Sequence, residues 1–149
     1  MRSVLAFLQN PWFKPGTNPE IIERYREDAD FRRKILAMSA TGRALRDAFG
    51  PLYQKIIWDN ASYESGESRE HMAKPDFLYM ARRVALVRPD VILLFGGQAQ
   101  LGWDRVCSMP DFSGLACRRV VLRAPHPMAR GSYKEHLSAI STEVRRLCQ

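Results

Sequence analysis

The sequence of 149 residues contains only three cysteines, Cys107, Cys117 and Cys148, and none of them belongs to a CxxC pair. An odd number of scattered cysteines fits no disulfide framework, and the missing pairs argue against zinc and iron–sulfur sites. We therefore expect a reduced cytoplasmic protein that needs neither a metal nor another cofactor.

Long hydrophobic runs are also missing. The apolar run near the amino terminus is too short for the core of a signal peptide, and no later run approaches the ~20 residues of a membrane-spanning helix. We therefore expect no membrane partner. The length favours one domain, residues 1–149, and we expect it to be a monomer.

Acidic residues are fewer than basic ones. The 16 Asp and Glu residues face 23 Lys and Arg residues, so the formal net charge is +7 and the isoelectric point is about 9.7. This charge favours a polyanionic partner such as nucleic acid, although many basic proteins bind none. The 46% of hydrophobic residues is enough for a core and argues against global disorder.

Four short apolar runs predict buried strands: Val4–Leu8, Lys55–Trp58, Val91–Phe95 and Val120–Leu122. Their continuous apolar character is typical of a parallel sheet that is covered on both faces. Because helical patterns fill the gaps between them, we expect an α/β fold, a three-layer αβα sandwich around a mainly parallel four-stranded sheet.

The helical patterns have recognisable ends. Asn18, Pro19 and Glu20 form an N-terminal signal, and a helical pattern follows in IIERYREDADFRRKILAM. Gly50 is a C-cap signal. The other predicted helices are Thr41–Phe49, Pro75–Val87, Gln98–Cys107 and Ser132–Leu147.

Polar residues follow each predicted strand, in the loops LQNPW, WDNAS, FGGQA and APHPMARG. Ligands of open parallel sheets bind beyond the carboxyl ends of the strands. Two amides, a histidine and an aromatic residue would meet there. An amide can read an imide edge such as that of a pyrimidine, and a histidine can donate to developing negative charge.

These loops resemble the motifs of the uracil-DNA glycosylase superfamily. LQNPW resembles its first motif, which reads GQDPY in one branch and G-x-N-P-G in another, and HPMARG resembles its second motif, HPSPLS. IIWDN is similar to the strand that ends in the base-reading Asn, and RPDVILLFGGQA to the third strand and its turn. The resemblance implies that DNA is the partner and that a base is flipped out of the helix and excised.

The resemblance also implies roles for individual residues. Asn10 would position the attacking water, and His126 would hydrogen-bond a base carbonyl as charge builds on the ring. Because an amide does not ionise, Asn10 predicts slower chemistry than in the branch that carries Asp. Asn60 would read the base, Trp12 would reject a base with a 5-methyl group, and Gln9 and Pro11 would complete the base-binding loop.

DNA contacts are expected on both sides of the fourth strand. Arg130 falls where the family places the residue that fills the gap left by the flipped base, and Gly131-Ser132 opens the last helix, where backbone N–H groups could hold a phosphate. The residues expected to contact DNA are Arg118, Arg119, Met128, Arg130, Ser132 and Lys134.

The sequence also departs from the family pattern. LQNPW lacks the leading Gly, HPMARG lacks the Ser after His-Pro, and the aromatic residue that would stack on the base has three candidates, Phe13, Tyr25 and Phe31. Two other functions therefore stay open. The chain could recognise a modified base in DNA without cleaving it, or it could be a small α/β domain that binds a free nucleotide.

Overall fold

Four parallel strands form the centre of the molecule. The computed structural model describes residues 1–9, 11, 13–63, 74–116, 119–128 and 133–149. The strands lie side by side in the order β2-β1-β3-β4, and every neighbouring pair is parallel. Their bounds are Val4–Leu8 (β1), Ile57–Asn60 (β2), Val91–Phe95 (β3) and Val120–Ala124 (β4). The predicted α/β class with a parallel four-stranded sheet is confirmed.

The bounds of two strands differ from the prediction, and β2 ends at Asn60 rather than at Trp58. β2 begins at Ile57 rather than at Lys55, because the N–H groups of Lys55 and Ile56 both bond to Leu52 O and close the turn of a preceding 3-10 helix. β4 continues to Ala124, which pairs with Phe95 of β3. Both changes move polar residues closer to the carboxyl ends of their strands.

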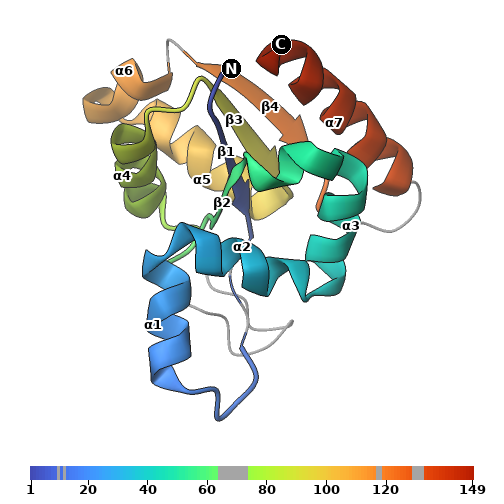
Figure 1. Cartoon of the computed structure of the whole chain (residues 1–149). Coiled ribbons are helices and arrows are strands. Elements are labelled where there is room, and N and C mark those ends of the chain that lie inside the picture. Colours follow the sequence, from blue (N-terminus) through green and yellow to red (C-terminus); the bar gives the residue numbers. More distant parts are fainter. Residues whose placement is uncertain (10, 12, 64–73, 117–118, 129–132) are drawn as a thin grey trace.

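Helices connect the strands along the chain and cover the sheet (Figure 1). The first predicted helix is in fact two helices, because the Asp28 side chain accepts a hydrogen bond from Phe31 N and starts a second helix there. Asn18 caps the first helix, and Gly50 ends the third, as expected. The helices are α1 Pro19–Glu27, α2 Ala29–Ala37, α3 Ala40–Phe49, η1 Gly50–Gln54, α4 Phe77–Val87, α5 Gly97–Ser108, η2 Pro110–Phe112, α6 Ser113–Ala116 and α7 Tyr133–Cys148.

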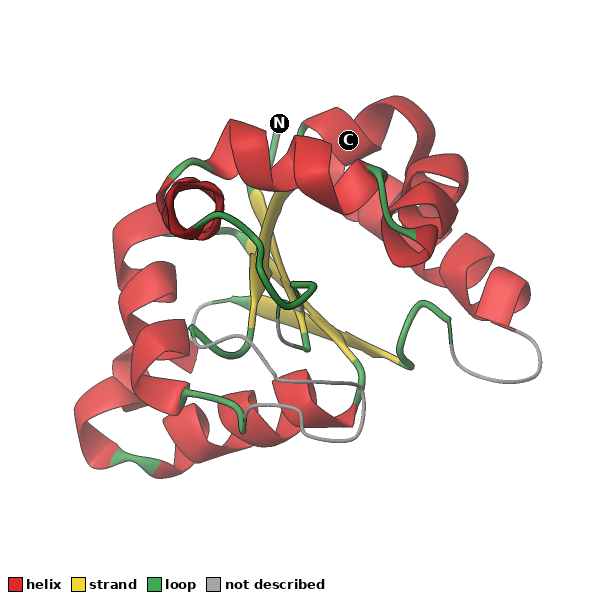
Figure 2. Cartoon of the chain, turned by 90° about the horizontal axis from the view of Figure 1, so that it is seen from below, coloured by secondary structure: helices red, strands yellow, loops and turns green. Residues whose placement is uncertain are grey.

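The sheet has a hydrophobic core on each face, as Figures 1 and 2 show by the helices on its two sides. On one face, Trp58 and Phe95 pack with residues of α2, α3 and α7. On the other face, Leu5 and Phe7 pack with Trp103 and other residues of α4 and α5. This alternation along each strand gives the three layers, and it leaves the strand ends as the edge where loops gather.

No helix in the described part of the chain is both long and apolar enough to span a membrane.

Candidate functional site

A pocket of about 260 Å³ lies at the carboxyl ends of the strands. It is lined by Gln9 and Pro11 after β1, by Asn60 at the end of β2 and by His126 after β4. The structure therefore brings together four of the residues that the sequence singled out from separate loops. The position is the one expected for ligands of an open parallel sheet.

The Asn60 side chain is fixed by a tyrosine from α1. Its Nδ2 donates a hydrogen bond of 2.7 Å to the Tyr25 hydroxyl, and both residues are buried. Burial raises the pKa of Tyr25 to about 12, so the hydroxyl keeps its proton at ordinary pH. Since that oxygen already accepts from Asn60, its proton is available to a ligand in the pocket, while Asn60 Oδ1 is available to accept.

A buried arginine holds α1 against the strand that carries Asn60. Arg32 is 2% exposed, and its guanidinium donates to the carbonyls of Tyr25 and Arg26, which lie in the last turn of α1. It also donates to Trp58 O at 3.1 Å. Because β2 is the edge of the sheet, this contact also satisfies a carbonyl that has no neighbouring strand.

Behind Asn60 lies a buried carboxylate. Asp59 is 2% exposed, lies 2.6 Å from Arg83 Nε and 4.0 Å from Arg32 Nη1, and accepts a hydrogen bond of 2.7 Å from the Tyr79 hydroxyl. It also accepts from the backbone N of Asn60 at 2.8 Å. These contacts give Asp59 a structural role, and it is not among the residues that line the pocket.

His126 is held as a neutral imidazole. Its Nδ1 accepts a hydrogen bond of 3.1 Å from Met128 N, and burial lowers the pKa of the ring below its ordinary value of 6.5. In the neutral ring the proton must then be on Nε2, which makes that nitrogen a hydrogen-bond donor. In this state the ring can donate a hydrogen bond from Nε2 to developing negative charge.

The loop that carries His126 is positioned by β3 and α5. Gly96 N and Gln100 Nε2 both donate to Ala124 O, the last carbonyl of β4. Gly96 has a φ of +86°, which favours glycine, and a Cβ there would lie 3.6 Å from the Cβ of His126. Gly96 and Gln100 thus fix the histidine loop from the neighbouring strand and helix.

The far wall of the pocket is the corner between α2 and α3. Ser39 and Thr41 at the amino end of α3 line the pocket together with Ile35 and Leu36. Ser39 is occupied as the N-cap, because its hydroxyl accepts from Gly42 N and donates to Leu36 O. The positive end of the α3 dipole therefore lies at this wall, and none of the described lining residues is acidic.

Two of the three aromatic candidates line the pocket. Phe13 and Tyr25 meet edge to face with ring centroids 5.2 Å apart, whereas Phe31 packs beneath the guanidinium of Arg24 and is not part of the pocket. Because the Tyr25 hydroxyl is bound to Asn60, Phe13 is the better candidate for stacking on a planar ligand.

The remaining predicted residues fall into three groups. Arg119 lies at the amino end of β4, where it donates to the carbonyls of Pro89 and Leu115, so the structure does not bring it to the pocket. Met128 and Lys134 line a separate groove between α3 and α7. The residues outside the described part of the chain are Asn10, Trp12, Arg118, Arg130 and Ser132.

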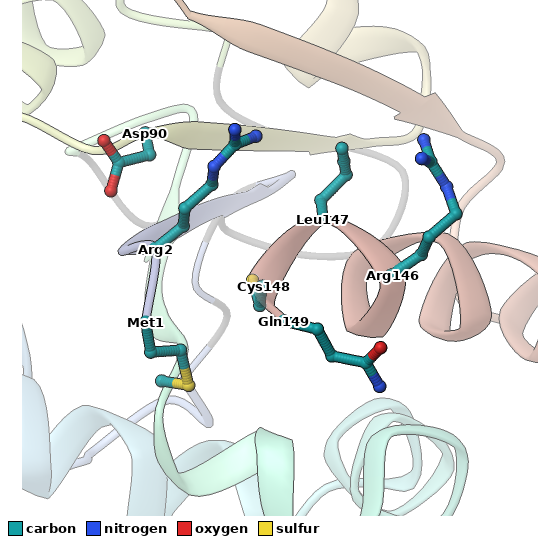
Figure 3. A pocket seen from close by; sticks show the side chains of 7 residues that line it. All are labelled: Met1, Arg2, Asp90, Arg146, Leu147, Cys148 and Gln149. Atoms are coloured by element: carbon teal, nitrogen blue, oxygen red, sulfur yellow. The ribbon is translucent and has the colours of Figure 1, made fainter.

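Two other hollows lack this combination of polar groups among their described lining residues. One of about 480 Å³ lies where the first two residues face the last turn of α7 (Figure 3). It is at the amino end of the sheet, and burial raises the pKa of the Cys148 thiol beside it, which disfavours the reactive thiolate. Another of about 870 Å³ lies between α4 and α5. Among the described residues, no group of three or more His, Cys, Asp or Glu could hold a metal ion.

Sequence reasoning missed the partners that stabilise the site. Arg32 and Arg83 occur within ordinary helical patterns, and nothing in their spacing indicates that both reach Asp59. One signal was available for Asp59: it directly follows the buried residues of a strand, where a carboxylate requires a partner.

No family model matches the chain, and the search of the curated proteins gives no significant match. The resemblance to uracil-DNA glycosylases therefore depends on the four sequence motifs.

Proposed function

We propose that the chain is a monofunctional DNA glycosylase that removes uracil or a related modified or deaminated base and leaves an abasic site. One observation carries the proposal: Gln9, Pro11, Asn60 and His126, which come from three motifs, line one pocket at the carboxyl ends of the strands. Parallel strands bring their carboxyl ends to one edge of the sheet, and here the groups at that edge line a hollow that also contains an aromatic ring.

The pocket supplies a pattern that fits an imide edge. Asn60 Oδ1 accepts from a ring N–H, and the Tyr25 hydroxyl donates to the adjacent carbonyl. Phe13 offers a face for the flipped base. A base with the reverse arrangement of donor and acceptor would leave both groups unsatisfied, which costs ~1–3 kcal/mol for each buried group.

In the proposed reaction, the bond between the sugar and the base breaks and its electron pair leaves with the base. Water adds to the sugar carbon, and the proton that the water loses balances the charge of the departing base. His126 stabilises that charge by donating from Nε2, and the dipole of α3 acts in the same direction. Asn10 is proposed to position the water. Because no described lining residue is acidic, the cationic sugar receives little stabilisation, and we expect slow turnover.

The test is excision from labelled oligonucleotides that carry uracil, hydroxymethyluracil, hypoxanthine, thymine opposite guanine or modified cytosines, followed by heating in alkali. We expect cleavage on at least one substrate, and we expect His126→Ala to lower its rate by ~10²–10³, the usual cost of losing one donor to a developing anion. His136→Ala is the matched control, because His136 is exposed on α7 and outside the pocket.

A second variant tests how the base is read. Tyr25→Phe removes only the hydroxyl that binds Asn60, and the loss of a hydrogen bond worth ~1 kcal/mol should reduce excision by roughly fivefold to tenfold. Tyr53→Phe is its control, since that hydroxyl donates to Arg33 O and is not part of the pocket. Binding of a modified base without alkali-labile breaks on any substrate would refute the enzyme and favour a protein that only recognises the base.

A further inference from the structure

A groove of about 640 Å³ runs between α3 and α7, which lie side by side on the right of Figure 1. Its floor on α3 is made by Ala40, Ala44 and Ala48, which recur every fourth residue and so share one face of the helix. Because alanine side chains are small, they leave space above this face of the helix. The groove is therefore a consequence of the α3 sequence and not of a gap in the core.

The groove is positively charged. Arg43 on α3 and Lys134 and Arg145 on α7 line it, and Asp47 is the one acid among the described lining residues. The guanidinium of Arg43 donates to Met38 O, and that of Arg145 donates to the carbonyls of Ala48 and Phe49. Both cations are thus held in place by uncharged backbone groups, which leaves their charge for a ligand.

The groove begins where the pocket ends. Ser39 and Thr41 of the first turn of α3 line the pocket, whereas Ala40 and Arg43 of the same turn line the groove. On the other side, His126 lines the pocket and Met128, whose N–H bonds to that histidine, lines the groove. A linear ligand that extends from the pocket between these residues therefore enters the groove directly.

We propose that the α3–α7 groove binds one strand of DNA, namely the segment next to the nucleotide in the pocket. Arg43 and Lys134 contact its phosphates, and the ring of Tyr133, which also lines the groove, offers a stacking surface for a base. This assignment rests on the proposed function for the identity of the strand. It adds a contact surface on α3 that none of the sequence motifs indicated.

The experiment measures the affinity for an unmodified single-stranded oligonucleotide at several salt concentrations. Each lost phosphate contact should reduce the slope of log K against log salt by ~0.7 for a single strand. The double variant Arg43→Ala/Lys134→Ala should therefore reduce the slope by ~1.4 relative to the wild type. Because the probe carries no excisable base, this result is independent of whether the chain cleaves DNA.

The matched control is Lys55→Ala/Arg82→Ala, which removes the same charge from exposed positions outside the groove. An equal reduction in both double variants, or none in either, would overturn the groove as the binding surface. Lys134→Ala alone should reduce the slope by ~0.7, which keeps the test valid if loss of the Arg43 contact with Met38 O weakens the fold. If polyglutamate of the same charge competes for the groove as well as the oligonucleotide does, the groove binds acidic peptides and the proposal is refuted.

Discussion

The ends of β2 and β4 both deliver a residue to the pocket, but they are held by different means. At the end of β2, Asn60 is backed by a buried carboxylate and two arginines that come from α2 and α4. At the end of β4, His126 is placed by backbone contacts with β3 and by one hydrogen bond from Met128. Asp59, Arg32 and Arg83 thus form a polar brace that fixes Asn60, the proposed base-reading group, as part of the fold. His126, the proposed charge-stabilising group, depends instead on local loop geometry.

The largest expected effect comes from breaking the brace behind Asn60. Asp59→Ala should lower the free energy of unfolding by ~3–5 kcal/mol, because it leaves buried Arg32 without its counterion. Urea denaturation measures the change. Asp104→Ala is the control, since Asp104 pairs with Arg123 at 2.6 Å, the distance between Asp59 and Arg83 Nε, but on the surface, where such a pair contributes only ~0–1 kcal/mol. Equal losses in the two variants would show that burial is not what makes the brace strong.

A smaller effect is expected at the end of β4. Gly96→Ala forces an L side chain into a φ of +86° beside His126, and it should cost ~1–2 kcal/mol of stability. Gly97→Ala should be neutral or slightly stabilising, because a Cβ there meets nothing within 4 Å and alanine favours the helix that begins at that residue. Urea denaturation compares the two variants, and NMR of the imidazole reports whether the ring moves. A Gly97 variant as unstable as the Gly96 variant would contradict the assigned role of the positive φ.

The smallest effect is the pH response of His126. Because its pKa is lowered in the folded state, the unfolded chain takes up a proton first as the pH falls through about 6.5. The wild type should therefore lose stability relative to His126→Gln as the pH falls through that window, with no further relative loss below the pKa of the folded state. Urea denaturation at a series of pH values tests this. A relative gain of stability on acidification would mean that the folded protein favours the charged ring.

The sequence contained enough information for the sheet but not for the brace. The apolar runs predicted all four strands, because strands buried on both faces are uniformly hydrophobic. The motifs predicted that Asn60 and His126 would meet, because parallel strands all end at one edge. The break at Asp28 was missed because the apolar pattern continues across it, although Asp is a common N-cap. Arg32 could not be placed, since its contacts with Trp58 O and Asp59 arise from long-range packing.

The order of the strands has a consequence for how the chain reaches this structure. β1 is made first, yet its partners are β2 and β3, with residue 5 opposite residue 57 and residue 4 opposite residue 91. No hairpin can form early, because every strand pairing in this sheet is parallel and spans a long loop. The segment VLAFL therefore stays without β2 until residue 60 has been synthesised and without β3 until residue 95. Folding should be slow for a chain of this size, and a chaperone that binds short apolar segments has a target in β1 while that strand is unpaired.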